Sequence, residues 1–189
     1  MLDQLIQLDK EVFLFLNGLG VESWDGFWLF VTNKWNSIPI YLILLVLSFK
    51  YLGLKKTILL LMAVTLLITV TDQLANFFKY GVQRLRPCHD IEVNGVMRLV
   101  KSYCGGNYGY FSAHAASSFA LATFFSLLFK TKVRFIVLFL LIWAFLVSYS
   151  RIYIGVHFPL DILTGIMVGI LFGWLFSKLY IFATLKIKA

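Results

Sequence analysis

Residues that could carry out nucleophilic or acid–base chemistry gather in the segment SRIYIGVHFPLD, which runs from Ser150 to Asp161 between two long apolar stretches. Arg151 ends the first stretch, and Pro159 stands where the first turn of a helix accepts proline. If the helix begins near His157, Asp161 lies on the same face one turn later. A carboxylate bound to one imidazole nitrogen raises the basicity of the other nitrogen. The spacing therefore predicts a nucleophile or base, although a purely structural His–Asp cap would use the same residues.

A second polar group ends the glycine-rich segment CGGNYGYFSAH, residues 104–114. Ser112 is a favourable N-cap for the apolar helix expected to follow. The free backbone N–H groups of its first turn, at Ala113 and His114, can face an anion. A single histidine at the boundary of water and lipid is also common without any catalytic role. The glycine-rich loop and the helix start favour an anion-binding function for His114.

Cations form the third group, in the segment KYGVQRLRP from Lys79 to Pro87. Lys79 and Arg86 are seven residues apart, close to two helical turns, so both project from one face if the helix continues that far. Pro87 would then end the helix. Two converging cations suit a doubly charged phosphate, although cations that snorkel at a membrane edge are an equal alternative. Arg84 and Arg98 are weighed only as head-group contacts.

The elements that would position these groups are membrane helices. Hydrophobic residues make up 60% of the 189-residue chain and aromatic residues 17%, with a mean hydropathy of +0.85, whereas soluble domains are about 45–50% apolar. The excess falls in blocks long enough to cross a bilayer, which takes about 17–25 residues. We therefore predict an all-α, polytopic membrane helix bundle. Its five clear spans are residues 38–54, 57–79, 112–129, 133–150 and 159–180.

Residues 1–35 are predicted to form interfacial helices rather than a span. Apolar residues follow helical spacing with polar residues between them, a pattern typical of a helix that lies on the membrane surface. They are Leu2, Leu5, Ile6, Val12, Phe13 and Leu16, separated by Asp3, Gln7, Asp9 and Lys10. A sixth span in this region stays an alternative, although glycines and charges interrupt it. No cleavable signal peptide is apparent, and residues 1–189 are expected to form a single domain.

Charges divide unequally between the two sides that this topology defines. The chain has 17 basic and 9 acidic residues, with a net charge of +8. One side receives only basic residues, so the positive-inside rule makes it cytoplasmic and anionic lipids are its expected partners. These residues are Lys50, Lys55, Lys56, Lys130, Lys132, Arg134, Lys178, Lys186 and Lys188. The net charge thus reflects orientation and indicates no nucleic-acid partner. In a bacterial inner membrane, the three polar groups would face the periplasm.

Both cysteines, Cys88 and Cys104, lie in the long outer loop. A disulfide can persist on that side of the membrane, and closing a loop of this length would contribute about 3 kcal/mol. Two free thiols are the alternative that the sequence leaves open.

The three groups together resemble the signature of the type 2 phosphatidate phosphatase superfamily. The first family motif is a lysine, six residues and Arg-Pro, which the segment from Lys79 to Pro87 matches. The third is Ser-Arg, five residues, a histidine, three residues and an aspartate, which Ser150 to Asp161 matches. The second, Pro-Ser-Gly-His, differs in half of its positions because Phe111 and Ala113 replace proline and glycine. The resemblance covers roughly residues 57–175, the core that carries the motifs.

The resemblance implies a role for each matching residue. His157 would attack phosphorus and form a phosphohistidine, Asp161 would hold it, and His114 would protonate the leaving oxygen. The phosphate oxygens would be bound by Lys79, Arg86, Arg151, Ser112 and the N–H of Ala113. The resemblance implies no metal or other cofactor, and no cluster of His, Asp and Glu in the sequence has ligand spacing. Ala113 would be strained if its position requires a positive φ.

Loops this short leave little room for a soluble substrate, and a site at the membrane boundary suits a lipid phosphate or diphosphate. By resemblance, the candidates are undecaprenyl diphosphate or a similar polyprenyl lipid, which we favour, and then phosphatidylglycerophosphate, phosphatidate and the phosphates of lipid A. Two other functions stay open: transfer of the phosphoryl group to another lipid or sugar, and lipid binding without catalysis. The sequence indicates neither the head group nor the oligomeric state.

Overall fold

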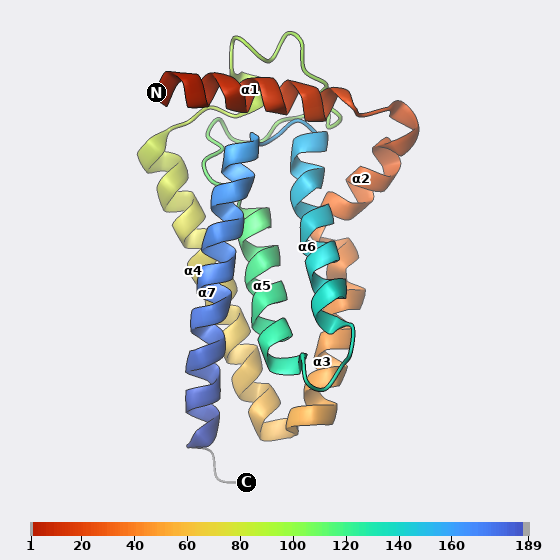
Figure 1. Cartoon of the computed structure of the whole chain (residues 1–189), viewed down its shortest axis with the longest axis vertical. Coiled ribbons are helices and arrows are strands. Elements are labelled where there is room, and N and C mark those ends of the chain that lie inside the picture. The colour runs from red at the N-terminus through yellow and green to blue at the C-terminus, as the bar shows by residue number, and fades with distance from the viewer. Residues whose placement is uncertain (1, 187–189) are drawn as a thin grey trace.

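The computed structural model describes residues 2–186, which form helices joined by turns and loops (Figure 1). Helix α1 (Leu2–Gly18) lies across one end of a bundle of long helices, and the short α2 (Asp25–Thr32) leads from that end into the bundle. The long helices are α3 (Ile38–Leu52), α4 (Leu54–Val82), α5 (Ala113–Phe129), α6 (Ile136–Tyr153) and α7 (Pro159–Leu185). Short 3-10 turns occupy Glu22–Trp24, Lys34–Ser37 and Pro87–His89.

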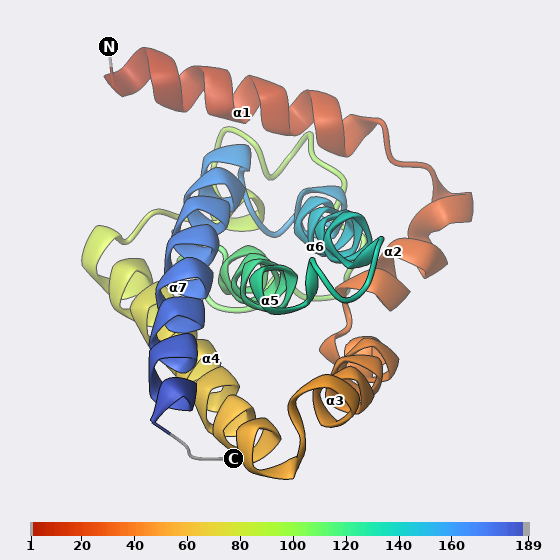
Figure 2. The same cartoon turned by 60° about the horizontal axis from the view of Figure 1, so that its bottom comes forward.

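Within residues 2–186, four helices are long and apolar enough to cross a membrane, if the turn before α3 is counted with it. They are the helix Lys34–Leu52, α4, α6 and α7. Helix α5 is apolar but has only 17 residues, and it stands at the centre with the other long helices around it (Figure 2). Most of its residues are buried in protein. The predicted all-α membrane bundle is confirmed, and five spans are reached only when the short central helix is included.

Helix α1 is amphipathic and lies across the end of the bundle, while its position at a membrane surface stays a prediction. Neither α1 nor α2 is among the helices that could cross a membrane, so residues 2–33 form no sixth span. Buried residues recur once per turn on the inner face of α1, at Asp9, Phe13 and Asn17. The Phe13 ring packs edge-on against the ring of Phe158, with centroids 5.2 Å apart. This contact sets α1 against the start of α7.

Helices α5 and α7 pack at close range because α7 carries a glycine on each turn of one face, at Gly165, Gly169 and Gly173. A Cβ atom added to Gly165 would lie 2.7 Å from the Ser112 carbonyl oxygen. Gly169 faces the Ala116 carbonyl oxygen even more closely, and Gly173 repeats the arrangement one turn on. Small residues of this kind let membrane helices approach each other. The glycine stripe therefore fixes the start of α5 against the first turns of α7.

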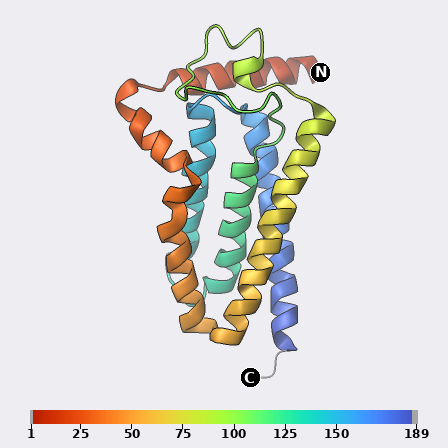
Figure 3. The same ribbon diagram turned by 180° about the vertical axis from the view of Figure 1, so that it is seen from behind.

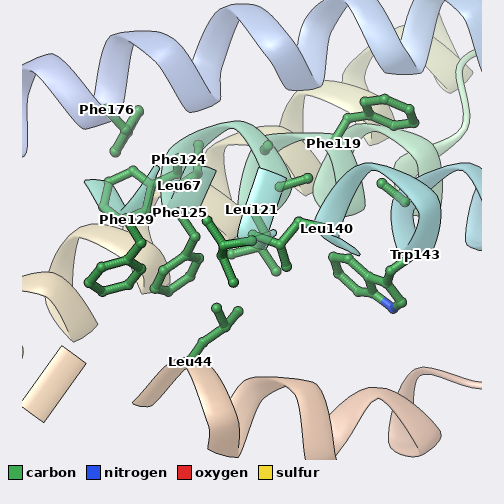
Figure 4. Packing of buried hydrophobic residues seen from close by; sticks show 14 of the residues in the cluster. Leu44, Leu67, Phe119, Leu121, Phe124, Phe125, Phe129, Leu140, Trp143 and Phe176 are labelled. Carbon is green, nitrogen blue, oxygen red and sulfur yellow. The ribbon is translucent and has the colours of Figure 1, made fainter. Parts of the chain in front are cut away.

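An apolar core fills the middle of the bundle, where α5 packs against its neighbours. Its large side chains include Phe124, Phe125 and Phe129 of α5 and Trp143 of α6, and Leu44 of α3 faces them (Figure 4). The rings of Phe125 and Phe129 are stacked with centroids 6.0 Å apart. This core holds the helices together but contains none of the predicted catalytic groups.

The two ends of the bundle differ as the topology predicts. The α3–α4 and α5–α6 connections and the end of α7 meet at the end opposite α1 (Figures 1 and 3). These segments carry the predicted cytoplasmic cations, of which Lys188 lies outside the described residues. Loop 83–112 lies at the other end, beside α1, and part of it extends beyond that helix (Figure 1). The separation of basic residues is thus a property of the fold, while the direction of the bundle in a membrane stays a prediction.

Replacing Gly169 by alanine is expected to force α5 and α7 apart and to destabilise the protein. Overpacking of this kind costs about 1–3 kcal/mol, so the midpoint of thermal unfolding in detergent should fall by several degrees. Gly81→Ala in α4 is the matched control, because nothing lies within 4 Å of a Cβ atom there. Equal midpoints for the two variants would contradict the close α5–α7 contact.

Candidate active site

The three polar sequence segments come together at the end of the bundle that α1 covers. They contribute the end of α4, loop 83–112, the start of α5, the end of α6 and the start of α7 (Figure 3). The charges of Lys79, Arg86 and Arg151 act on the imidazole of His157. His157 and two of these cations also act on His114. The structure therefore gathers the predicted cations and both histidines into one site.

His157 and Asp161 form a buried pair at the start of α7. His157 Nδ1 lies 3.3 Å from Asp161 Oδ2, and the same oxygen accepts the backbone N–H of Phe158 at 3.0 Å. The two side chains are 3% and 0% exposed. The helix begins at Pro159 rather than near His157, so the pair forms because Asp161 turns back to cap the helix start. One carboxylate thus holds both the imidazole and the helix terminus.

The start of α5 lies against this pair. Ser112 is the N-cap, as predicted, and its Oγ accepts the N–H of Ala115 at 3.4 Å. Its own N–H donates to the Asp161 carbonyl oxygen at 3.0 Å. Ala113 is the first helical residue, and among residues 2–186 only Gln83 combines a side chain with a positive φ. The alanine that replaces the family's glycine is therefore not strained.

The other departure from the family motif, Phe111, forms part of the apolar wall between α4 and α5. It is buried against Ala75 and Ala116, and its ring centroid lies 5.7 Å from that of Phe78. The family motif has a proline at position 111, which would stiffen the backbone before α5. Here these contacts and the hydrogen bond from the Ser112 N–H to Asp161 hold that segment in place.

Lys79 and Arg86 reach the site by a different route from the one predicted. Helix α4 does not continue to Arg86, because Gln83 adopts a left-handed φ of 55° and ends it. The chain then runs extended along the glycine-rich loop, where the Arg86 N–H donates to the Asn107 carbonyl oxygen at 3.0 Å. The prediction of two continuous helical turns, ended by Pro87, is therefore wrong. Pairing with the loop, rather than helical periodicity, brings the two cations together.

The extended segment places Arg84 and Arg86 on the same side, because alternate side chains of a strand share a face. Arg86 donates to two backbone carbonyl oxygens, at 3.2 and 3.3 Å. Gly109 leaves room for it: a Cβ atom there would lie 3.1 Å from Arg86 Cγ and 3.2 Å from Asp161 Oδ2. The glycine-rich loop thus admits a guanidinium beside the His–Asp pair.

Arg151 is a largely buried cation of the site. Its Nη1 donates to Thr32 Oγ1 at 2.6 Å, whereas its Nε is buried without a hydrogen-bond partner. A buried donor without an acceptor is unfavourable, so a bound phosphate oxygen would satisfy this N–H. Thr32 ends α2. The N-terminal segment therefore helps to orient Arg151, which is predicted to bind phosphate.

Arg84 and Asp9 contribute to the site in a way that the sequence does not reveal. Arg84 donates to Asp161 Oδ1 at 3.0 Å and to Asp9 Oδ2 at 2.5 Å. The available signal is the position of Asp9: it follows the spacing of the buried face of α1, where an acid is out of place. A charged residue at such a position requires a buried partner.

Cys88 and Cys104 are joined by a disulfide in the structure, with Cα atoms 6.2 Å apart. The link closes the loop beside Arg86. His89 lies next to it, and the potential ligand atoms of these three residues lie within 4.8 Å of one another. Disulfide sulfurs do not offer the thiolates that a metal requires. In this bonded form the group leaves a single imidazole and cannot hold a metal ion.

Comparison with known proteins shows which family the chain belongs to. Residues 55–184, more than half of the chain, match the PAP2 superfamily. The chain is 36% identical to a lipid A 4'-phosphatase of Bacteroides thetaiotaomicron and 34% identical to one of Porphyromonas gingivalis, each over 157 residues. These alignments cover 82% of this chain and 69% and 65% of the two relatives.

Two solved structures share the fold. The crystal structure of Aquifex aeolicus LpxE superimposes with a TM-score of 0.64 and 28% identity, over 89% of this chain and 93% of that one. A PAP2-type phosphatidylglycerolphosphate phosphatase from Bacillus subtilis superimposes with a TM-score of 0.73 over 98% of this chain and 88% of that one. Its 18% identity supports the fold alone.

The helical bundle and these relatives define an integral membrane phosphatase that acts on lipid phosphate, a phosphoric monoester hydrolase. The chain belongs to the PAP2 superfamily. This confirms the family that the three ordered motifs indicate.

Activity is expected to persist in mildly acidic solution. Burial holds the pKa of His157 well below its ordinary value of 6.5, and the charges of Arg86 and Arg151 lower it further. The imidazole therefore stays neutral as the pH falls through 6.5 and is protonated only below that value. After correction for ionisation of the substrate phosphate, the acid limb of kcat/KM should have its midpoint below 6.5. A midpoint above that value would contradict the buried, cationic environment of His157.

Proposed function

We propose that the chain hydrolyses lipid phosphate monoesters through a phosphohistidine on His157, with lipid A as the first candidate substrate. The observation that carries the proposal is a cavity of about 770 Å³ that connects the site with the apolar interior. Its polar end includes His114 and Thr32, the residue that holds Arg151. A cavity that runs from His114 and Thr32 into an apolar interior suits a phosphate attached to hydrocarbon.

The cavity has the size and lining that a lipid chain requires. Ligand pockets usually measure about 300–1,000 Å³ and are mostly apolar. From His114 the walls continue between α3, α4 and α5, along residues such as Leu45, Leu60, Leu121 and Phe125. A lipid bound here would place its phosphate at the polar end and its chain among these side chains.

The first half of the reaction would transfer the phosphoryl group to His157. With Nδ1 held by Asp161, the lone pair on Nε2 attacks phosphorus. The bond between phosphorus and the lipid oxygen breaks as the new P–N bond forms, and His114 donates a proton to the departing oxygen.

The second half would release phosphate and restore the enzyme. Water attacks the phosphorus of the phosphohistidine, His114 accepts a proton from that water, and the P–N bond breaks. Lys79, Arg86 and Arg151 would hold the non-bridging oxygens in both transition states. The N–H groups at the start of α5 would add to this cradle.

The identity of the relatives supports lipid A as the substrate. The Bacteroides and Porphyromonas proteins are lipid A 4'-phosphatases, and no comparison supports the undecaprenyl diphosphate that we favour from sequence alone. Undecaprenyl diphosphate, phosphatidylglycerophosphate and phosphatidate therefore become comparison substrates. We infer from the basic, acid-free end of the bundle that the site faces the periplasm of a bacterial inner membrane.

Substitution of the nucleophile tests the mechanism. His157→Gln should reduce phosphate release from lipid A by at least about a hundredfold. His89→Gln, in loop 83–112 at the same end of the bundle but outside the site, should retain activity. Purified protein in detergent would be assayed against all four lipids with and without a chelator. Phosphate release by His157→Gln within tenfold of wild type would rule out the phosphohistidine route. In labelled water, unlabelled product phosphate would indicate a different chemistry from hydrolysis.

A pair of tryptophan variants tests the lipid-chain site. Leu45→Trp should fill the cavity and raise KM for a long-chain lipid phosphate about tenfold, while hydrolysis of para-nitrophenyl phosphate stays unchanged. Leu42→Trp is the control, because Leu42 lies on the same helix, is exposed, and does not line the cavity. Equal losses with both variants, or with both substrates, would argue against this cavity as the lipid site.

A further inference from the structure

A buried row of alternating charges links the N-terminal helix to the candidate nucleophile. The Arg84 guanidinium bridges two carboxylates, with Nη1 3.0 Å from Asp161 Oδ1 and Nη2 2.5 Å from Asp9 Oδ2. The carboxylate side chains are 0% and 2% exposed, and that of Arg84 is 18% exposed. On the far side of Asp161, Oδ2 lies 3.3 Å from His157 Nδ1. Three consecutive polar contacts therefore connect Asp9 with the imidazole.

Asp9 is held firmly in this row. Its second oxygen, Oδ1, accepts the N–H of Leu160 in the first turn of α7 at 2.8 Å. Two turns further along α1, Asn17 donates to the carbonyl oxygens of Ile152 and Tyr153 at the end of α6. Helix α1 is thus bonded to the chain on both sides of His157, and Asp9 cannot shift without breaking contacts to α7.

Arg84 has two competing effects on Asp161. Its hydrogen bond fixes the carboxylate, but its positive charge also draws electron density away from the oxygen that His157 contacts. A second carboxylate on the far side of the guanidinium offsets this effect, and charges interact strongly in a buried site. With Asp9 in place, Asp161 is oriented by Arg84 and still acts as a full counter-charge for the imidazole.

We propose that Asp9 and Arg84 are positioning residues, which orient the Asp161 carboxylate and set the basicity of His157. The inference rests on the proposed role of His157 as nucleophile. It assigns part of the active site to α1, which lies outside residues 55–184, the part of the chain that matches the superfamily. It also gives the interfacial helix a role in the chemistry.

Other charged groups also face His157, and the test must leave them in place. They are Arg86, Arg151, Lys79, His114 and Asp161. Neither Asp9→Asn nor Arg84→Gln removes any of these groups, although Arg84→Gln takes away one hydrogen bond to Asp161. A change in the pH profile would therefore report Asp9 and Arg84, acting through Asp161.

The two substitutions should shift the acid limb of kcat/KM in opposite directions. Asp9→Asn removes a negative charge, so the pKa of His157 falls and the limb moves to lower pH. Arg84→Gln removes a positive charge, so the limb moves to higher pH. Each shift should be about half a pH unit or more, with kcat lowered about tenfold and KM changed less than threefold. The same lipid phosphate is used throughout, so ionisation of the substrate cancels.

Lys10→Gln is the matched control for loss of α1 anchoring. Lys10 is the next residue on the helix and forms ion pairs with Asp90 at 2.8 Å and Glu92 at 3.0 Å, but it does not belong to the row. Its pH profile should equal that of the wild type. If Lys10→Gln shifts the profile as Asp9→Asn does, the effect comes from anchoring and the proposal is overturned.

The double variant Asp9→Asn/Arg84→Gln keeps the test decisive if a single variant fails to fold. It removes both charges, so the opposite shifts partly cancel and its acid limb should lie between those of the single variants while kcat stays low. Shifts of both single variants in the same direction, or a double variant whose limb lies outside the range between them, would overturn the proposal. An active His157→Gln would instead refute the underlying mechanism, which separates the two failures.

Discussion

The site depends on the burial of one carboxylate at the start of a membrane helix. Asp161 is fully buried, and an unpaired charge there would be strongly unfavourable. Each of its polar atoms is accordingly used: Oδ2 meets His157 and the Phe158 N–H, Oδ1 meets Arg84, and the backbone oxygen accepts the Ser112 N–H. These bonds join α7, loop 83–112 and the start of α5. The need to satisfy this single residue therefore brings the three motif segments together.

Close packing of α5 against α7 also stabilises this arrangement. The glycine stripe of α7 allows the first turns of α5 and α7 to touch through backbone atoms, which are stiffer than side chains. The Ser112 carbonyl that faces Gly165 belongs to the residue whose N–H bonds Asp161. Helix packing and site geometry are thus set by the same few atoms.

Much of this arrangement could be predicted from sequence, because the relevant signals are local. Hydropathy defines the helices, and the spacing of His157 and Asp161 defines the pair. The route of Arg86 could not be predicted, because the helix ends at Gln83, a residue with no strong tendency to a left-handed conformation, and pairing with the loop is a long-range interaction. The roles of Asp9 and Thr32 were equally hidden. Each lies more than a hundred residues from its partner at the start of α7 or the end of α6, and no periodicity links them.

Helix α3 has fewer packing partners than the central helix α5, and this difference affects how such a protein can evolve. Helix α3 packs chiefly against α4 and forms one wall of the cavity. The candidate site residues lie instead on α4, α5, α6 and α7, in the turn between α6 and α7, and in loop 83–112. Substitutions on α3 can reshape that wall without moving the His–Asp pair. If this cavity binds the lipid chain as proposed, natural selection can diversify the accepted lipids through α3 while the reaction itself is inherited unchanged.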